Sequence, residues 1–444
     1  MKMKFAYILL LAAFISSCSK KNDRAFDETP EERVNKVLNQ YQTQLESGVN
    51  GWKGLLSNGT SSVYSFFFKF DNKNRVVMYS DFKSDFAGTG KESSYRLKAL
   101  QQVSLLFDTY SYIHVLADPD PSVAGGATGS GYNVDFEFYF DNATNDTITL
   151  IGRKHYNQLQ LVRATKAEAD AYAAGNMKNA MLLNDNYGKI LQYWKTFTLG
   201  STTYQMTLDT AGRSVTMFYK SGTAVRRGTS KYYYTANGMT LLTPIAGVGT
   251  TITGFSNISW NSANSTIGMR VNNTNVTLSG VNAPAAIEAG IAQTFRVDAG
   301  STGTYWYNYE GVRVNGVNNA YRTDTLTFND STGTYTNYYL FYQPGTLSAT
   351  TDGFAPVFLN QAQTGVYLKY GTYPEVAINN TDGRMILTEN SLFPDYTYPT
   401  TGAADLMRKW IYNPGGLYLV KIDDENYDMV SAADPTSWMR WHLW

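Results

Sequence analysis

Apolar residues near the start of the chain follow the spacing of a helix. A stripe at three- and four-residue intervals comprises Val34, Val37, Leu38, Tyr41 and Leu45. Thr29-Pro30-Glu31-Glu32 precedes this stripe and has the composition of a capping box with proline at the first helical position. Gly48 follows it and is a typical residue for a helix end. The pattern predicts an amphipathic helix that lays its apolar stripe on a sheet.

The spacing then changes to the two-residue alternation of strands. Strands are expected at residues 64–70, 75–82, 95–100, 103–107, 133–140, 147–151 and 158–162. Residues 71–74 and 142–145 supply turn chemistry between neighbouring strands, and residues 118–131 form a loop rich in Pro, Gly and Ser. Strands joined by such connections predict an antiparallel meander.

The same succession of helix and strands recurs further along the chain. Thr165-Lys166-Ala167-Glu168 is a second capping box, and residues 165–194 are expected to be helical with a break near Gly175-Asn176. YQMTLDTAGRSVTMFY then matches the earlier FFFKFDNKNRVVMYSD. The pairs separated by 138 positions are Asp71 with Asp209, Arg75 with Arg213, Val77 with Val215, Gly90 with Gly228, and Tyr95 with Tyr233. Order and spacing predict a duplicated unit, with chance similarity between two hairpins as the alternative.

Later matches extend the repeat and delimit a third region. Residues 148–152 resemble residues 276–280 at an offset of only 128, which indicates a shorter loop in the second copy at the place of residues 118–131. From residue 283 the chain is β-rich and heavy in Tyr, Thr, Asn and Gly. Within it, Asp382-Gly383-Arg384 resembles the arginine-bearing hairpin, residues 403–412 predict a helix, and residues 437–444 predict a last strand.

The N-terminus has the pattern of an exported lipoprotein. Two lysines precede the apolar run of residues 5–15, which is too short to span a bilayer and fits a signal peptide. Ile15-Ser16-Ser17-Cys18 then forms a lipobox, and Cys18 is the only cysteine. We expect Cys18 to carry the lipid, a palmitate-type acyl group, and to anchor the chain in the membrane. By analogy with the bacterial sorting rule, Ser19 favours the outer membrane; the cell surface and the periplasmic face both stay open.

Together these patterns predict a mainly β (α+β) fold. It consists of tandem antiparallel β-meander or barrel-like modules, each preceded by an amphipathic helix, plus a β-rich C-terminal region. The expected division is a signal peptide at 1–17, a lipidated tether at 18–28, a first module at 29–163, a second module at 164–282 that repeats the first, and the C-terminal region at 283–444.

Charge and reactive residues argue for binding rather than catalysis. Lys+Arg and Asp+Glu both number 37, which gives no electrostatic basis for nucleic-acid binding. The three histidines lie far apart, and no metal motif or phosphate loop is present, so neither a metal nor a cofactor is expected. Asp135 and Glu137, two apart on a strand with Phe136 and Phe138 on its other face, are the one glycosidase-like option. Their simpler interpretation is the solvated face of a half-buried strand.

Aromatic residues are in excess in this chain, which contains 34 tyrosines, 22 phenylalanines and 8 tryptophans. The densest run is Tyr305, Trp306, Tyr307, Asn308 and Tyr309. On a strand Trp306 faces the core while the three tyrosines share the other face. Rings that stack, with an amide beside them, suit a glycan or a peptide, so this run is the predicted ligand site. The alternative is that tyrosine is simply a good strand former.

Several motifs together resemble a known family. These are the lipobox, ETPEER, the early Gly51-Trp52, FKFDNKNRVVMYSD, SYRLKAL, LLFDTYSYIHVLADPD, VDFEFYF and TITLIGRK. They are similar to the Bacteroidetes lipoproteins of domain of unknown function 4302, over most of the first module and more loosely after Trp194. The resemblance implies a nutrient-uptake context beside outer-membrane TonB-dependent importers of the SusC/SusD type. It supplies no catalytic residues.

The expected function is therefore a non-enzymatic one. The chain is interpreted as an outer-membrane-anchored lipoprotein that acts as a binding or assembly accessory of a nutrient importer. Its expected partners are membrane lipid, importer components and a glycan or peptide. One alternative is a hydrolase of the same system that uses carboxylates such as Asp135 and Glu137. The other is an integral outer-membrane β-barrel, since such barrels also carry many aromatic residues.

Overall fold

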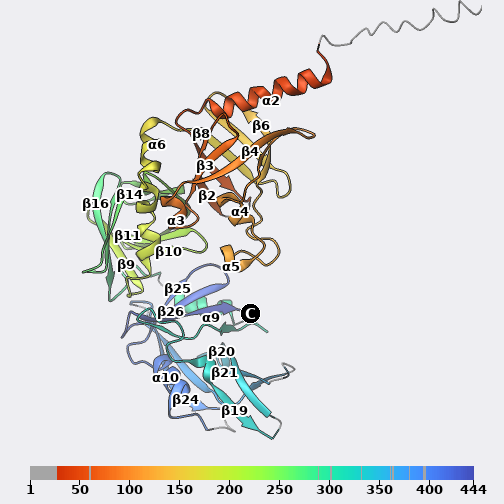
Figure 1. Ribbon diagram of the computed structural model, residues 1–444. Coiled ribbons are helices and arrows are strands. Elements are labelled where there is room, and N and C mark those ends of the chain that lie inside the picture. Colours follow the sequence, from red (N-terminus) through yellow and green to blue (C-terminus); the bar gives the residue numbers. More distant parts are fainter. Residues whose placement is uncertain are drawn as a thin grey trace, which may run out of the picture.

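The fold consists of three antiparallel barrels in tandem. The computed structural model describes residues 28–59, 62–288, 290–300, 303–331, 333–360, 362, 365–379, 381–393 and 397–444. The predicted signal peptide, Cys18 and nearly all of the tether lie outside these residues. Within them the barrels follow one another along an elongated molecule (Figure 1). None of the helices in the described ranges is long and apolar enough to cross a membrane.

Barrel 1 is an eight-stranded meander that closes on itself. Its strands are β1 (Trp52–Ser57), β2 (Val63–Phe70), β3 (Arg75–Ser80), β4 (Lys91–Ala99), β5 (Val103–Phe107), β6 (Glu137–Ala143), β7 (Thr147–Gly152) and β8 (Gln158–Arg163). Closure follows because β1 pairs with both β2 and β8. The alternation predicted from the sequence places Ile148 and Leu150 of β7, and Leu159 and Leu161 of β8, in the apolar interior.

Barrel 2 repeats this topology. Its strands are β9 (Trp194–Leu199), β10 (Thr202–Asp209), β11 (Ser214–Ser221), β12 (Ala224–Thr235), β13 (Gly238–Ala246), β14 (Thr251–Asn261), β15 (Thr266–Val271) and β16 (Thr274–Val281). The connection between the fifth and sixth strands holds α4 (Tyr112–Ala117) and α5 (Pro121–Ala124) in barrel 1. The corresponding connection from β13 to β14 is a short turn. The second copy is thus shorter at the loop that the sequence indicated.

The β-rich C-terminal region closes into a third ring, barrel 3. The ring strands, in chain order, are β17 (Trp306–Asn308), β20 (Gly333–Ser348), β21 (Thr351–Asn360), β23 (Thr372–Ile378), β24 (Met385–Leu392), β25 (Leu417–Lys421), β26 (Asn426–Ser431) and β27 (Ser437–Leu443). The additional strands are β18 (Arg313–Val314), β19 (Thr327–Asp330) and β22 (Val366–Leu368), and η1 (Thr323–Thr325) precedes β19. The predicted helix is α10 (Gly402–Ile411), again between the fifth and sixth ring strands.

A tryptophan opens the first strand of each barrel and is fully buried. Trp52, Trp194 and Trp306 are each 0–1% exposed. The indole of Trp52 donates to the carbonyl of Leu45 in the preceding helix α2 (Pro30–Glu46), at 2.8 Å. Trp306 makes the same bond, at 2.9 Å, to Phe295 in α9 (Ile291–Asp298). The repeated unit therefore occurs three times, and Asp382-Gly383-Arg384 lies in a different hairpin, between the fourth and fifth ring strands.

The helices begin where the capping boxes predicted. Thr29 caps α2 and Thr165 caps α6 (Lys166–Ala173), each with the reciprocal glutamate contact. Gly175, at φ +77°, separates α6 from α7 (Asn176–Ala180), which α8 (Leu182–Tyr187) follows. The remaining short helix α3 (Ser84–Gly88) joins β3 to β4.

Only the second half of α2 packs on barrel 1, contrary to the expectation that its whole stripe would. Leu45 is buried, and the ring of Tyr41 stacks on Phe140 with 4.1 Å between centroids. Val34 and Val37 remain 42% and 39% exposed. The physical reason is length, because the helix runs past the edge of the barrel (Figure 1).

Barrels 1 and 2 are both closed eight-stranded meanders, but most of the residue pairs predicted at a constant offset of 138 are displaced by one position. Asp71 and Asp209 do correspond, since each carboxylate accepts backbone amides in the turn after the second strand. Beyond that turn, however, the amide of Tyr95 donates to Asn74, and the amide of Tyr232, not Tyr233, donates to Arg213. Arg213 therefore corresponds to Asn74 and not to Arg75.

The displacement arises because the turns after Asp71 and Asp209 differ in length. The predicted match of residues 148–152 with 276–280 is also wrong. The first segment lies in β7, the seventh strand, and the second in β16, the eighth. Every strand of a meander carries the same alternation, so an alignment can slip by one residue or by a whole strand. A slip of one residue turns each side chain to the opposite face.

Candidate functional site

The predicted aromatic run lies at the start of barrel 3, on β17. Trp306 is in the core, as alternation predicts, and stacks on Phe295 at 4.7 Å; because it is fully buried, its inclusion in the predicted ligand site is wrong. Tyr305 and Tyr307 are half-buried on the outer face and Tyr309 is exposed. Asn308 contradicts the role of ligand amide, because it is fully buried. Its Nδ2 donates to the carbonyl of Arg440 and its Oδ1 accepts from the amide of Gly311.

Neighbouring strands extend the outer rings into a continuous patch. β27 contributes His442 and is followed by Trp444, whose amide donates to the carbonyl of Tyr305 at 2.9 Å. β20 contributes Tyr338, Tyr339 and Phe341, with a bulge between Asn337 and Tyr339. We call this patch the aromatic surface; its members are Tyr305, Tyr307, Tyr309, Tyr338, Tyr339, Phe341, His442 and Trp444. Each ring lies within 6.4 Å, centroid to centroid, of at least one other member.

Exposure divides the aromatic surface into supporting and accessible rings. Trp444, Tyr309 and Tyr338 are 61%, 60% and 54% exposed, so these three can meet a ligand. Tyr305 stacks under Trp444, at 5.6 Å and 11° between planes, and acts as a support. The site predicted from the sequence included Tyr309 but neither Tyr338 nor Trp444, because strand pairing brings these two to β17 from distant segments.

Burial favours the neutral forms of two supporting groups of the aromatic surface, Tyr305 and His442. Burial, followed by the hydrogen bond to Tyr339, raises the pKa of the Tyr305 phenol, and the two hydroxyls lie 3.1 Å apart. Burial lowers the pKa of His442, whose Nδ1 lies 2.6 Å from Oδ1 of Asn426. The imidazole therefore stays uncharged, with its ring stacked on Tyr309 at 5.0 Å. The surface offers flat rings and hydroxyls, with one carboxylate beside them, since Oε1 of Glu310 lies 3.9 Å from Nε2 of His442.

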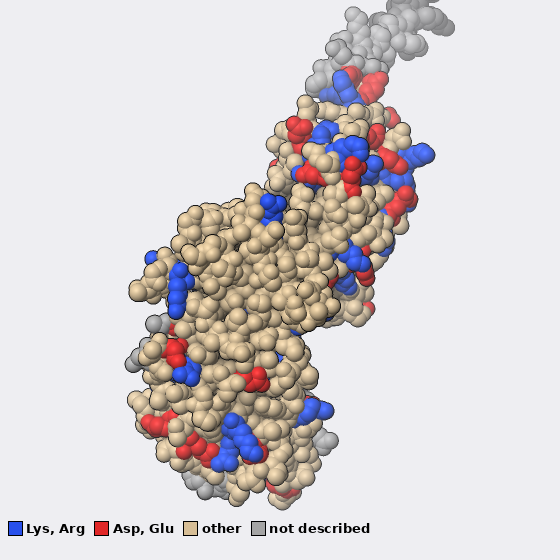
Figure 2. Space-filling model, turned by 90° about the vertical axis from the view of Figure 1, so that its left-hand side faces the viewer, with Lys and Arg blue, Asp and Glu red and all other residues tan. Residues whose placement is uncertain are grey.

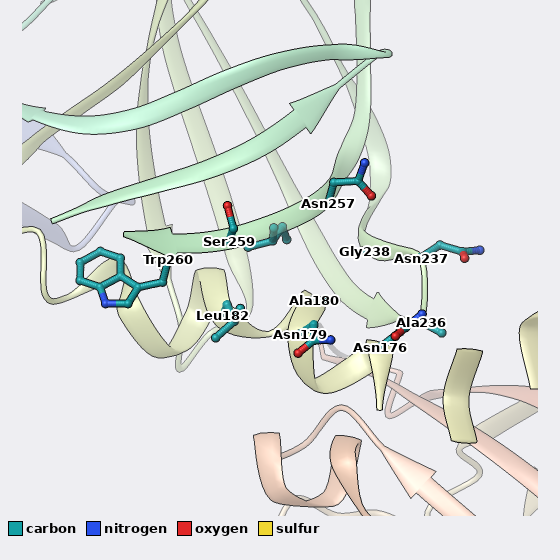
Figure 3. Close-up of a pocket in the computed structure, with 11 residues that line it drawn as sticks. Asn176, Asn179, Ala180, Leu182, Ala236, Asn237, Gly238, Asn257, Ser259 and Trp260 are labelled. Carbon is teal, nitrogen blue, oxygen red and sulfur yellow. The ribbon is translucent and has the colours of Figure 1, made fainter. Parts of the chain in front are cut away.

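A second uncharged surface, a groove on barrel 2, was missed by sequence reasoning. The groove measures 690 Å³ and lies between α7–α8 and β14. Its lining includes Asn176, Asn179, Asn237, Asn257 and Trp260, and contains no charged residue (Figure 3). The available signal was the segment between Lys231 and Glu288, in which Arg270 is the only charged residue. Charged side chains are correspondingly sparse over barrel 2 on the face in Figure 2.

Asp135, the first residue of the carboxylate-dependent hydrolase alternative, has a structural role. Asp135 precedes β6 and is 5% exposed; its carboxylate accepts the amides of Lys154 and His155 at 2.9 to 3.1 Å. The predicted alternation fails here, because Asp135 is buried whereas Phe136 is 37% exposed. A carboxylate held by backbone amides in a turn is not free to act as a nucleophile or base. Among the described residues no group of three or more His, Cys, Asp or Glu could hold a metal ion.

Comparison with known proteins gives a family but no activity. Solved structures with a resemblance include the DNA polymerase sliding clamp from Caulobacter crescentus, at 8% identity and a TM-score of 0.14, covering 90% of this chain and 95% of that chain. DNA polymerase III subunit beta from Borrelia burgdorferi gives 9% identity and a TM-score of 0.11, covering 92% and 97%. Similarity this weak carries no argument.

The sequence comparisons are more specific. No curated protein matches the chain. The model of one protein family matches residues 22–262, which covers barrel 1 and most of barrel 2 and stops before barrel 3. This match spans more than half of the chain, and the chain belongs to the family described as domain of unknown function (DUF4302).

Proposed function

We propose that this protein is a non-enzymatic, lipid-anchored binding protein of the outer membrane. It holds a neutral glycan on the aromatic surface of barrel 3 and serves as an accessory of a TonB-dependent, SusC/SusD-type nutrient importer. The observation that carries the proposal is the set of three exposed rings, Tyr309, Tyr338 and Trp444, braced by five further aromatic side chains.

The chemistry of this surface favours a sugar. Aromatic faces stack on the apolar faces of sugar rings, and each such contact contributes on the order of 1 kcal/mol. An extended peptide commonly binds by adding a strand to a sheet edge. β17 has no free edge for this mode of binding, because it is paired with β20 on one side and with β27 on the other. Because the net charge of the chain is zero, it provides no net electrostatic attraction for nucleic-acid phosphates.

The binding test uses a double variant at the exposed rings. Tyr309→Ala/Trp444→Ala should weaken binding of a neutral oligosaccharide about tenfold or more, by loss of two stacking contacts. The thermal midpoint should change little, since both side chains are mostly exposed. Calorimetry with α-glucan, β-glucan, xylan and mannan oligosaccharides measures the affinity.

A matched control for this test lies on barrel 1. Tyr110 is 47% exposed and outside the aromatic surface, so Tyr110→Ala should leave the affinity unchanged. The glycan proposal fails if none of the four oligosaccharide types binds the wild-type protein, or if the double variant binds as tightly as Tyr110→Ala.

Anchoring rests on the lipobox and is tested separately. Cells fed an alkynyl fatty acid should label the wild-type protein at Cys18 and not the Cys18→Ala variant, which should leave the membrane fraction. Equal labelling and equal membrane retention of both proteins contradict the lipid anchor. A chain beginning at Ser19 should dissolve without detergent, which an integral outer-membrane barrel would not do.

A further inference from the structure

A cleft of 470 Å³ lies between barrels 2 and 3, and its lining shares no residue with the aromatic surface. Barrel 2 contributes Lys195 of β9 and the segment around α8, and barrel 3 contributes Arg313 of β18 and parts of β26 and β27. The cleft has the size of a site for a small organic molecule, about 300–1,000 Å³. Neither barrel forms the cleft without the other.

Lys195 is an unusually buried lysine in this cleft. Its side chain is 7% exposed, and its Nζ donates to the carbonyl of Gln192 at 2.6 Å and lies 4.6 Å from the centre of the Tyr187 ring. Burial, and then the nearby guanidinium of Arg313, lower the pKa of Lys195 to about 7. Within the described part of the chain, no carboxylate forms an ion pair with Lys195 or Arg313. Lys195 and Arg313 thus line one cleft, and neither is held by a carboxylate of its own among the described residues.

The first barrel provides an internal comparison for this lysine. Trp52-Lys53 begins β1 as Trp194-Lys195 begins β9, and both tryptophans pair with the last strand of their barrel. Lys53 points at the next unit and forms an ion pair with Glu168 of α6 at 2.6 Å. At the equivalent junction after barrel 2, Lys195 meets Arg313 instead. The second junction lacks the anion that the first one contains.

The other charged side chains that line the cleft each have a hydrogen-bond partner of their own, and Asp428 and Arg440 form an ion pair with each other. Asp428 accepts from Arg440 at 2.8 and 3.0 Å and from the hydroxyl of Tyr193. Lys189 donates to Asn186. The two remaining carboxylates are also engaged, Asp185 by the hydroxyl of Ser84 and Asp209 by the amides of its own turn.

The pKa of about 7 brings the charge of Lys195 under the control of pH between about pH 6 and pH 9. Burial raises the pKa of Tyr187 and of Tyr193, and the lining contains no histidine.

We propose that this cleft is a binding site for a small oxyanion, a carboxylate or a sulfate-type group, held between Lys195 and Arg313. Arg313 offers a planar fork of donors and Lys195 a point charge, the usual pair for such groups. The bound anion supplies the counter-charge that Glu168 supplies to Lys53. It also contacts both barrels, so it fastens barrel 3 to barrel 2.

The test measures the affinity of sulfate and of glucuronate by calorimetry at about pH 6 and about pH 9, with the complete lipid-free chain. Both anions keep a constant charge over this range, so a change reports on the protein. Because Lys195 is protonated at the lower pH and neutral at the higher one, the affinity should fall at least tenfold between them. Sulfate binding alone identifies a tetrahedral inorganic anion, and glucuronate binding identifies an acidic sugar.

Variants make the outcome specific to this cleft. Arg313→Gln should weaken binding at both pH values, Lys195→Met should remove the pH dependence, and Lys53→Met should behave as wild type. Arg313 is less buried than Lys195, so Arg313→Gln remains informative if Lys195→Met fails to fold. The proposal is overturned if neither anion binds saturably, if affinity is the same at both pH values, or if Arg313→Gln binds as wild type.

Discussion

At the scale of single residues, what a polar side chain can do depends on the partners it already has. Asn308 and Asp135 have the chemistry of a ligand contact and of a catalytic carboxylate. Both are buried, and backbone groups occupy their donors and acceptors. Lys195 is also buried, but it has a single carbonyl acceptor and no ion-pair partner among the described residues. A buried group left without its counter-charge is the one that a ligand can complete.

The lysine also predicts a pH dependence of stability. With its folded-state pKa lowered to about 7, from an ordinary value of 10.5, Lys195 binds fewer protons in the folded protein than in the unfolded chain between these values. Stability should therefore rise as pH increases from 7 toward 10 in an anion-free buffer. Lys195→Met should lack this component. Urea unfolding at several pH values measures the free energy of unfolding of both proteins. If this free energy depends on pH in the same way in both, the lowered pKa of Lys195 is excluded.

At the scale of elements, identical local signals serve helices with different tertiary roles. Thr29 and Thr165 form the same capping box. The first turns of α2, however, leave Val34 and Val37 exposed. Helix α6 instead lies between barrels 1 and 2, where Tyr172 is 1% exposed and stacks on Phe67 at 4.6 Å. Capping begins a helix, but packing decides whether the whole molecule depends on it.

The two caps should therefore respond differently to alanine. Thr165→Ala should lower the free energy of unfolding by about 1 kcal/mol, because α6 is docked between two barrels. Thr29→Ala should leave global stability unchanged and speed amide hydrogen exchange in the first turns of α2. Chemical unfolding combined with exchange mass spectrometry measures both effects. An equal loss of global stability from the two variants would contradict this difference.

At the scale of the whole molecule, buried contacts join consecutive barrels, polar at the first junction and aromatic at the second. Asp81 of barrel 1 is fully buried and forms an ion pair with Arg213 of barrel 2. Its carboxylate also accepts the amides of Ser65, at 2.9 Å, and of Tyr234, at 2.8 Å. The second junction is built from Trp194, Tyr193 and Tyr418, with 5.7 Å between the rings of Trp194 and Tyr418.

Removing one member of the first junction should be costly. Asp81→Asn leaves the Arg213 guanidinium buried without an anion, which should lower the stability of the joined barrels by about 3–5 kcal/mol. Asp81→Asn/Arg213→Met removes the unpaired charge and should be less destabilised than the single variant. Thermal unfolding of the three proteins gives the comparison. A single variant as stable as wild type would mean that the ion pair does not hold the barrels together.

The sequence by itself determined the features that depend on neighbours within a few residues. The starts of α2 and α6 follow from contacts between a threonine and the glutamate three residues later. The turn at Asp71, the break at Gly175 and the inward position of Trp306 are likewise local. Alternation also assigned Tyr305, Tyr307 and Tyr309 to the outer face. Such features are fixed by backbone geometry and by the two-residue period of a strand.

Tertiary structure alone decided the features that join distant segments. The ring of barrel 3 requires β27 to pair with β17, and this pairing brings Trp444 to Tyr305. Lys53 finds Glu168 across 115 residues, whereas Lys195 meets Arg313 in a cleft whose Tyr193–Asp428 contact spans 235 residues. Two lysines with the same local sequence thus acquire opposite surroundings, because the charge beside each is set by which distant strand packs there.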